Sequence, residues 1–154
     1  MKKILFGFSL CLFVLVLFTG CFSKKVITAE QFKSKMEEKG LLVKDKTEEF
    51  SKTNYINKVY SAIDIDNTYE IEFYEMKDNS NAKSTFNDKK EAIESSNKVV
   101  STKFENNGTN YNKLVITTSD KYIIITRVKN TFLSVNVEKK YKSIIKDYVD
   151  YLGY

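Results

Sequence analysis

Hydrophobic and polar positions divide the chain into an apolar leader and a longer amphipathic part. Residues 4–18 are apolar at all but three positions, and Lys2 and Lys3 precede them. A helix that crosses a bilayer needs about 20 apolar residues, whereas this stretch stops at Thr19 and Gly20, small residues that a signal peptidase accepts. The pattern predicts that residues 1–20 are a cleaved secretory signal.

Helical spacing recurs three times in the remaining chain. Thr28 and Gln31 form a capping box, after which a helix is expected to run as far as Gly40. Asp78, Asn79 and Ser80 offer N-caps for a middle helix whose apolar positions are Ala82, Phe86 and Ile93. The last helix is expected over 139–152, with apolar residues Tyr141, Ile144, Ile145, Tyr148, Tyr151 and Leu152.

Alternating apolar residues predict strands between these helices. The expected strands are 59–65, 69–76, 99–105, 111–118, 121–128 and 131–137, with a short extended piece at 41–44. Both faces of the last three strands carry apolar residues, which predicts helices on both sides of the sheet. The fold class is therefore α+β: a largely antiparallel sheet of about six strands packed with an N-terminal, a middle and a C-terminal helix, in one domain over residues 28–154.

The register of the first hairpin decides where its acids lie. A three-residue loop that pairs Ile63 with Ile71 puts the large apolar side chains on one face. That register places Asp64 opposite Glu70. Asp66 and Glu72 would then lie nearby. Tyr60 and Tyr74 would share the polar face, where simple cross-strand packing is favoured over an exposed aromatic contact.

The net charge of the chain adds little to the prediction of its function. The formal charge of +5 falls to +3 once Lys2 and Lys3 are removed, because residues 1–20 contain no acid. Lysines and acids are interspersed, which indicates a solvated surface and argues against nucleic acid as a partner. Lys24 and Lys25 differ in position: beside a membrane anchor, each could gain about 1 kcal/mol from anionic head groups.

Phe18, Thr19, Gly20 and Cys21 resemble the lipobox of bacterial lipoproteins, with Phe18 in place of the usual aliphatic residue. The resemblance implies a diacylglycerol on the Cys21 thiol and cleavage between Gly20 and Cys21. Residues 21–27 would then tether the domain to the outer face of the cell membrane. An ordinary secreted protein and an uncleaved membrane anchor remain the alternatives.

The composition excludes several kinds of chemistry. The chain has no histidine, which removes the Ser-His-Asp and Cys-His nucleophile systems. Cys11 lies in the leader and Cys21 would be modified, so no thiolate remains for zinc or iron–sulfur ligation. The five glycines form no nucleotide-binding loop. We predict no catalytic residue, no enzyme activity and no cofactor other than the lipid on Cys21.

Asp64, Asp66, Glu70 and Glu72 form the one candidate constellation. Like charges that face each other across strands are destabilising, so a cation, a ligand or neighbouring lysines should offset them. Oxygen ligands suit Ca²⁺, although the residues 64–72 do not match an EF-hand loop. No metal is firmly predicted, and a solvated face neutralised by lysines is the competing interpretation.

These observations predict a membrane-anchored cell-envelope lipoprotein that acts as a non-catalytic binding domain. Its partners would be the bilayer, through Cys21, and an envelope protein or small ligand. A carboxylate-dependent enzyme or a Ca²⁺-binding envelope protein is the alternative. The Lys- and Asn-rich composition is also loosely similar to that of small lipoproteins of clostridia and related Firmicutes that have no assigned activity.

Overall fold

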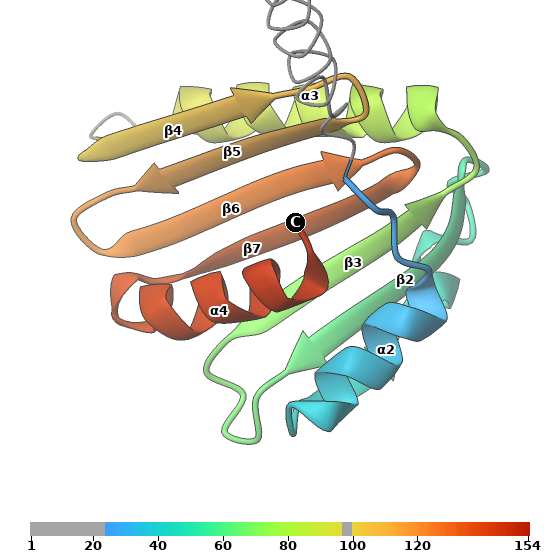
Figure 1. Ribbon diagram of the computed structural model, residues 1–154, viewed down its shortest axis with the longest axis horizontal. Helices are drawn as coiled ribbons and strands as arrows, with labels where there is room; N and C mark the ends of the chain where they lie inside the picture. The colour runs from blue at the N-terminus through green and yellow to red at the C-terminus, as the bar shows by residue number, and fades with distance from the viewer. Residues whose placement is uncertain (1–23, 97–99) are drawn as a thin grey trace, which may run out of the picture.

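The computed structural model describes residues 24–96 and 100–154, which form one antiparallel sheet with helices on both faces (Figure 1). The strands are β1 (Leu42–Asp45), β2 (Ile56–Ile63), β3 (Glu70–Met76), β4 (Thr102–Asn107), β5 (Tyr111–Thr117), β6 (Lys121–Val128) and β7 (Thr131–Glu138). Their order across the sheet is β1-β2-β3-β7-β6-β5-β4. The α+β class is confirmed, with seven strands instead of about six, because the short piece near residue 42 is an edge strand.

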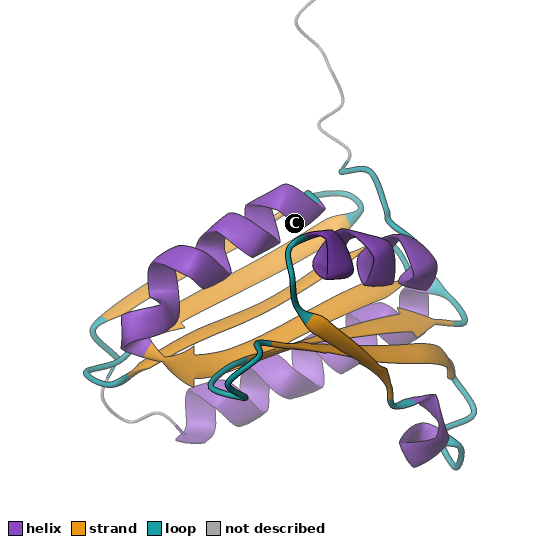
Figure 2. Ribbon diagram, turned by 90° about the horizontal axis from the view of Figure 1, so that it is seen from below, coloured by secondary structure: helices purple, strands orange, loops and turns teal. Residues whose placement is uncertain are grey.

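Three α-helices cover the sheet: α2 (Ala29–Glu38), α3 (Asn79–Ser96) and α4 (Lys142–Leu152). Short 3-10 helices lie at Thr47–Phe50 (η1) and Lys139–Tyr141 (η2). Helices α2 and α4 pack on one face and α3 on the other (Figure 2). The predicted capping box is present, since the Thr28 side chain accepts from the Gln31 N–H and the Gln31 side chain accepts from the Thr28 N–H. The side chain of Asp78 accepts from the Asn81 N–H and caps α3.

The core has two parts, one on each face of the sheet. On the face of α2 and α4, the rings of Phe32 and Phe73 stack with centroids 4.7 Å apart. On the face of α3, Phe86 packs with buried residues that include Leu114, Ile125 and Phe132. The predicted two-sided coverage of the last three strands is therefore confirmed.

The predicted register of the β2–β3 hairpin is wrong by one residue. Ile63 pairs with Glu70, and Ala62, not Ile63, pairs with Ile71. The cause is Asp64, whose carboxylate accepts from the N–H groups of Thr68 (2.6 Å) and Tyr69 (2.8 Å) and so closes a longer turn. This turn leaves Ile65 87% exposed, so local hydrogen bonding prevails over burial of that side chain.

The described chain begins with a segment that is already packed against the domain. The side-chain oxygen of Asn110 accepts from the Lys24 N–H (3.3 Å), and its amide donates to the Lys24 carbonyl (2.9 Å). Ile27 is buried in the core on the α2 side. Gly20 and Cys21 lie outside the described residues, and so do the predicted cleavage and lipidation. Over 24–96 and 100–154, no helix is long and apolar enough to span a bilayer.

Candidate functional site

A polar groove of about 280 Å³ lies on the sheet face that carries α3. It exists because α3 lies towards the β4 edge, where Lys90 pairs with Glu105 (2.5 Å) and Lys103 with Glu94 (2.6 Å). The middle of the sheet forms the floor. The lining residues are Glu70, Glu72, Lys89, Ile93, Ile123, Ser134, Val135 and Asn136.

Three neighbouring strands supply the floor, and the ladder fixes its polar side chains. Glu72 of β3 lies directly opposite Ser134 of β7. Asn136, two residues further along β7, lies opposite Ile123 of β6. Because side chains alternate between the faces of a strand, Ser134 and Asn136 point to the same side. The result is a polar strip, bordered by Ile123, where α3 leaves the sheet uncovered.

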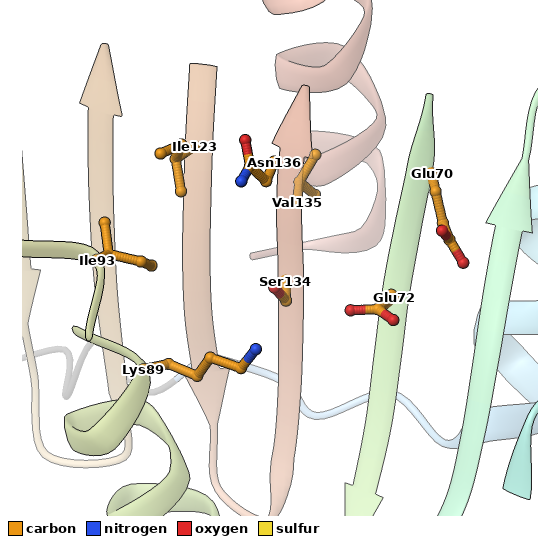
Figure 3. A pocket seen from close by; sticks show the side chains of 8 residues that line it. All are labelled: Glu70, Glu72, Lys89, Ile93, Ile123, Ser134, Val135 and Asn136. Atoms are coloured by element: carbon orange, nitrogen blue, oxygen red, sulfur yellow. The ribbon is translucent and has the colours of Figure 1, made fainter. Parts of the chain in front are cut away.

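The carboxylate of Glu70 is neutralised within the protein. Lys46 Nζ donates to it at 2.6 Å, and the buried Ser61 hydroxyl also donates to it. Burial alone would raise the pKa of Glu70, but these two hydrogen bonds hold that pKa below its usual value. The same pair raises the pKa of Lys46. Figure 3 shows the Glu70 side chain directed towards β2, away from Ser134.

Glu72 and Lys89 bring opposite charges to the two sides of the groove. Figure 3 shows the Lys89 amine reaching from α3 towards β7, while the Glu72 carboxylate lies on the other side of Ser134. Within the part of the chain that the structure describes, the two form no ion pair with each other. Burial, followed by the nearby Glu72 carboxylate, raises the pKa of Tyr74, so its hydroxyl stays protonated as a donor.

The four acids singled out from the sequence do not gather at one point. Glu70 and Glu72 both line the groove. Asp64 instead closes the hairpin turn, where its backbone and hydroxyl donors hold its pKa below the usual value against the effect of burial. Asp66 is exposed in that turn. Among the described residues, no group of three or more His, Cys, Asp or Glu side chains is placed to hold a metal ion.

The expected aromatic pair is also separated by the register shift. Tyr60 lies opposite Phe73 and is 5% exposed, with its hydroxyl donating to Glu30 at 2.6 Å. Tyr74 lies opposite Val59 in the other core cluster and is 7% exposed. The two rings therefore face opposite sides of the sheet and are buried. Both the favoured cross-strand packing of these rings and the alternative of an exposed contact are therefore wrong.

Sequence reasoning missed Lys89, Ser134 and Asn136. Ser134 and Asn136 sit in a strand that reads as an ordinary alternating segment, and Lys89 is one of several lysines on α3. The pairing of β3 with β7 brings Ser134 beside Glu72, and the position of α3 brings Lys89 to the same groove. That pairing joins segments about 60 residues apart, and no local pattern reports it.

A scan of protein-family models found no match for this chain, and comparisons with curated proteins and with solved structures found none either.

Proposed function

We propose that this chain is a lipid-anchored, extracytoplasmic binding protein whose ligand is a small zwitterion held in the groove beside α3. The observation that carries the proposal is the placement of Glu72 and Lys89 on opposite sides of Ser134 (Figure 3). A carboxylate and an ammonium separated by neutral polar groups complement a molecule that carries one charge of each sign.

The size of the groove limits the ligand. Its volume of about 280 Å³ lies just below the roughly 300–1,000 Å³ of common ligand pockets. An amino acid, a dipeptide or a betaine is of suitable size. The ligand's cationic group would lie beside Glu72 and its anionic group beside Lys89. Ser134 and Asn136 would supply hydrogen bonds between them, and Ile93 and Ile123 would contact its apolar part.

Binding explains the groove better than catalysis does. Glu70 is already paired with Lys46 and Ser61, whereas among the described residues Glu72 has only the neutral Tyr74 hydroxyl as a hydrogen-bond donor, so its charge remains for a ligand. A pair of carboxylates with separated roles, as glycoside hydrolysis requires, is therefore not provided by these two residues. The chain also has no histidine to serve as a general base near neutral pH.

Calorimetric titration tests the ligand class. The probes are glycylglycine and glycine betaine as zwitterions, putrescine as a cation and succinate as an anion. We expect a zwitterion to bind, and Glu72→Gln and Lys89→Gln each to weaken it about tenfold, equivalent to about 1.4 kcal/mol. Glu91→Gln, on an exposed part of α3, is the matched control and should bind as the parent does. Preference for putrescine or succinate, or binding of none of the probes, would contradict the proposal.

Metabolic labelling with a tagged fatty acid tests the anchor. We expect label in the membrane fraction for the intact chain and for Cys11→Ala, and loss of both label and membrane retention for Cys21→Ala. Unlabelled protein in the medium would indicate a secreted domain. Unlabelled protein in the membrane would indicate that the apolar leader remains attached.

A further inference from the structure

A second groove, of about 390 Å³, lies between α2 and α4 on the face opposite the α3 groove. Ile27 and Leu152 form its buried apolar floor, and Lys25, Lys35 and Tyr151 line its sides. The proposed zwitterion site makes no use of these residues. An apolar floor with a cationic rim suits an amphiphile that has an anionic head.

Two lysines and one glutamate surround the Tyr151 ring beside this groove. The amines of Lys35 and Lys39 lie 4.2 Å and 4.3 Å from the centroid of the Tyr151 ring. Glu38 accepts from the Tyr151 hydroxyl at 2.9 Å. Among the described residues that line the groove itself, the charged side chains are lysines and none is an acid. The groove is thus electrostatically complementary to an anion.

The start of the described chain relates this groove to the proposed anchor. Asn110 fixes Lys24 through two hydrogen bonds, and Lys25 lines the groove directly. Cys21 precedes Lys24 by three residues, and three residues of chain span at most about 11 Å at full extension. Residues 24–28 run on the side of the sheet that carries α2 and α4 (Figure 2). A lipid on Cys21 would hold the bilayer close to this side.

We infer that the α2–α4 face is the membrane-facing surface and that its groove seats the phosphate head group of an anionic phospholipid. Lys25 and Lys35 contact the phosphate, and Ile27 and Leu152 contact the upper acyl chain. The zwitterion groove then opens away from the bilayer, on the α3 side. This inference rests on the anchoring part of the proposed function and is independent of the identity of the zwitterion.

Lysine footprinting on the full chain tests the orientation. The chain is reconstituted into vesicles of phosphatidylcholine alone, or of phosphatidylcholine with 30% phosphatidylglycerol, and treated with a water-soluble acylating reagent. Mass spectrometry then reports the reactivity of each lysine. We expect phosphatidylglycerol to protect Lys25 and Lys35 severalfold and to leave Lys83, exposed on α3, unchanged.

Flotation of the same vesicles distinguishes failure of the anchoring from failure of the orientation. A chain that does not float with either lipid would overturn the anchoring, and this inference with it. A chain that floats but shows Lys25 and Lys35 as reactive as in phosphatidylcholine alone would overturn only the orientation.

Native mass spectrometry in detergent tests the groove itself, using phosphatidylglycerol and phosphatidylcholine in competition. Each lysine removed from the groove weakens its attraction for a head group of net negative charge. We therefore expect each removal to lower the ratio of bound phosphatidylglycerol to bound phosphatidylcholine about fivefold. Lys25→Gln with Lys35→Gln should therefore lower it by tenfold or more. The control pair, Lys52→Gln with Lys83→Gln, removes the same charge from exposed positions outside the groove. If this lipid ratio falls equally in both double variants, or falls in neither, the groove does not select the anionic lipid.

Discussion

Arg127 donates two hydrogen bonds to the single side-chain oxygen of Asn112, from Nε at 2.9 Å and from Nη2 at 2.7 Å. Its Nη1 donates to the Lys129 carbonyl at 3.1 Å and to the Asn79 side chain at the start of α3. Arg127 is 2% exposed, and the partners of its guanidinium are all neutral oxygens. Burial accordingly lowers the pKa of Arg127. One side chain thus joins β6, β5 and the helix that walls the candidate groove.

Replacing Arg127 should loosen α3 as well as the sheet. We expect Arg127→Met to lower the free energy of unfolding by about 1–3 kcal/mol, because it leaves amide oxygens without their charged donor. Arg127→Lys should recover little, since an ammonium cannot reproduce the planar fork. Urea unfolding measures the change. Lys83→Met, an exposed substitution on α3, is the control and should stay within about 0.5 kcal/mol. Equal midpoints for Arg127→Met and this control would show that the network is not stabilising.

Asp64 should prove stabilising, contrary to what a cluster of repelling acids implies. Its carboxylate accepts from the N–H groups of Thr68 and Tyr69 and from the Thr68 hydroxyl at 2.7 Å. We expect Asp64→Ala to cost about 1–2 kcal/mol, by analogy with the loss of a capping side chain. Asp66→Ala in the same turn is the matched control, because its side chain is exposed.

Thermal unfolding followed by circular dichroism distinguishes the two expectations for this turn. A lower melting temperature for Asp64→Ala alone supports the closing role of its carboxylate. A rise in both variants would mean that charge repulsion dominates the hairpin.

The elements that could be predicted from sequence are those whose pattern is local. The meander β5–β6–β7 was placed almost to the residue, because alternation and turn residues define each strand. Helix α2 followed from the Thr28–Gln31 capping box, and α4 from its apolar spacing. Each signal lies within about fifteen residues of chain, where periodicity and capping act.

The candidate site depended on features that a local pattern does not carry. Burial of Ile65 favours one register of the β2–β3 hairpin, but the hydrogen bonds of Asp64 stabilise another. Compared with the predicted register, every β2 side chain therefore lies on the opposite face relative to β3. The sequence indicates Glu70 and Glu72 as candidates because they are acidic residues within a predicted strand, and both line the groove. Their partners Ser134 and Lys89 became visible only with the β3–β7 pairing and the position of α3.

The Lys46–Glu70 pair should make part of the protein's stability depend on pH. Because the pKa of Glu70 is lowered in the folded state, its ionised form stabilises the fold at pH values above the ordinary pKa of a glutamate in the unfolded chain. That contribution is lost as the pH falls through the lower folded-state pKa. The side chains are 39% and 23% exposed, for Glu70 and Lys46 respectively, so solvent screening limits the effect to about 1 kcal/mol.

Comparing the parent with Glu70→Gln at pH 7 and pH 3 measures this dependence by urea unfolding. We expect the parent to be more stable at pH 7 by up to about 1 kcal/mol and the difference to shrink at pH 3, because a larger fraction of Glu70 is protonated there. Glu91→Gln, which removes an exposed carboxylate from α3, controls for net charge. A difference that stays the same at both pH values would mean that the ionised pair contributes nothing. In that case Glu70 would stabilise the hairpin through its hydrogen bond from Ser61 alone.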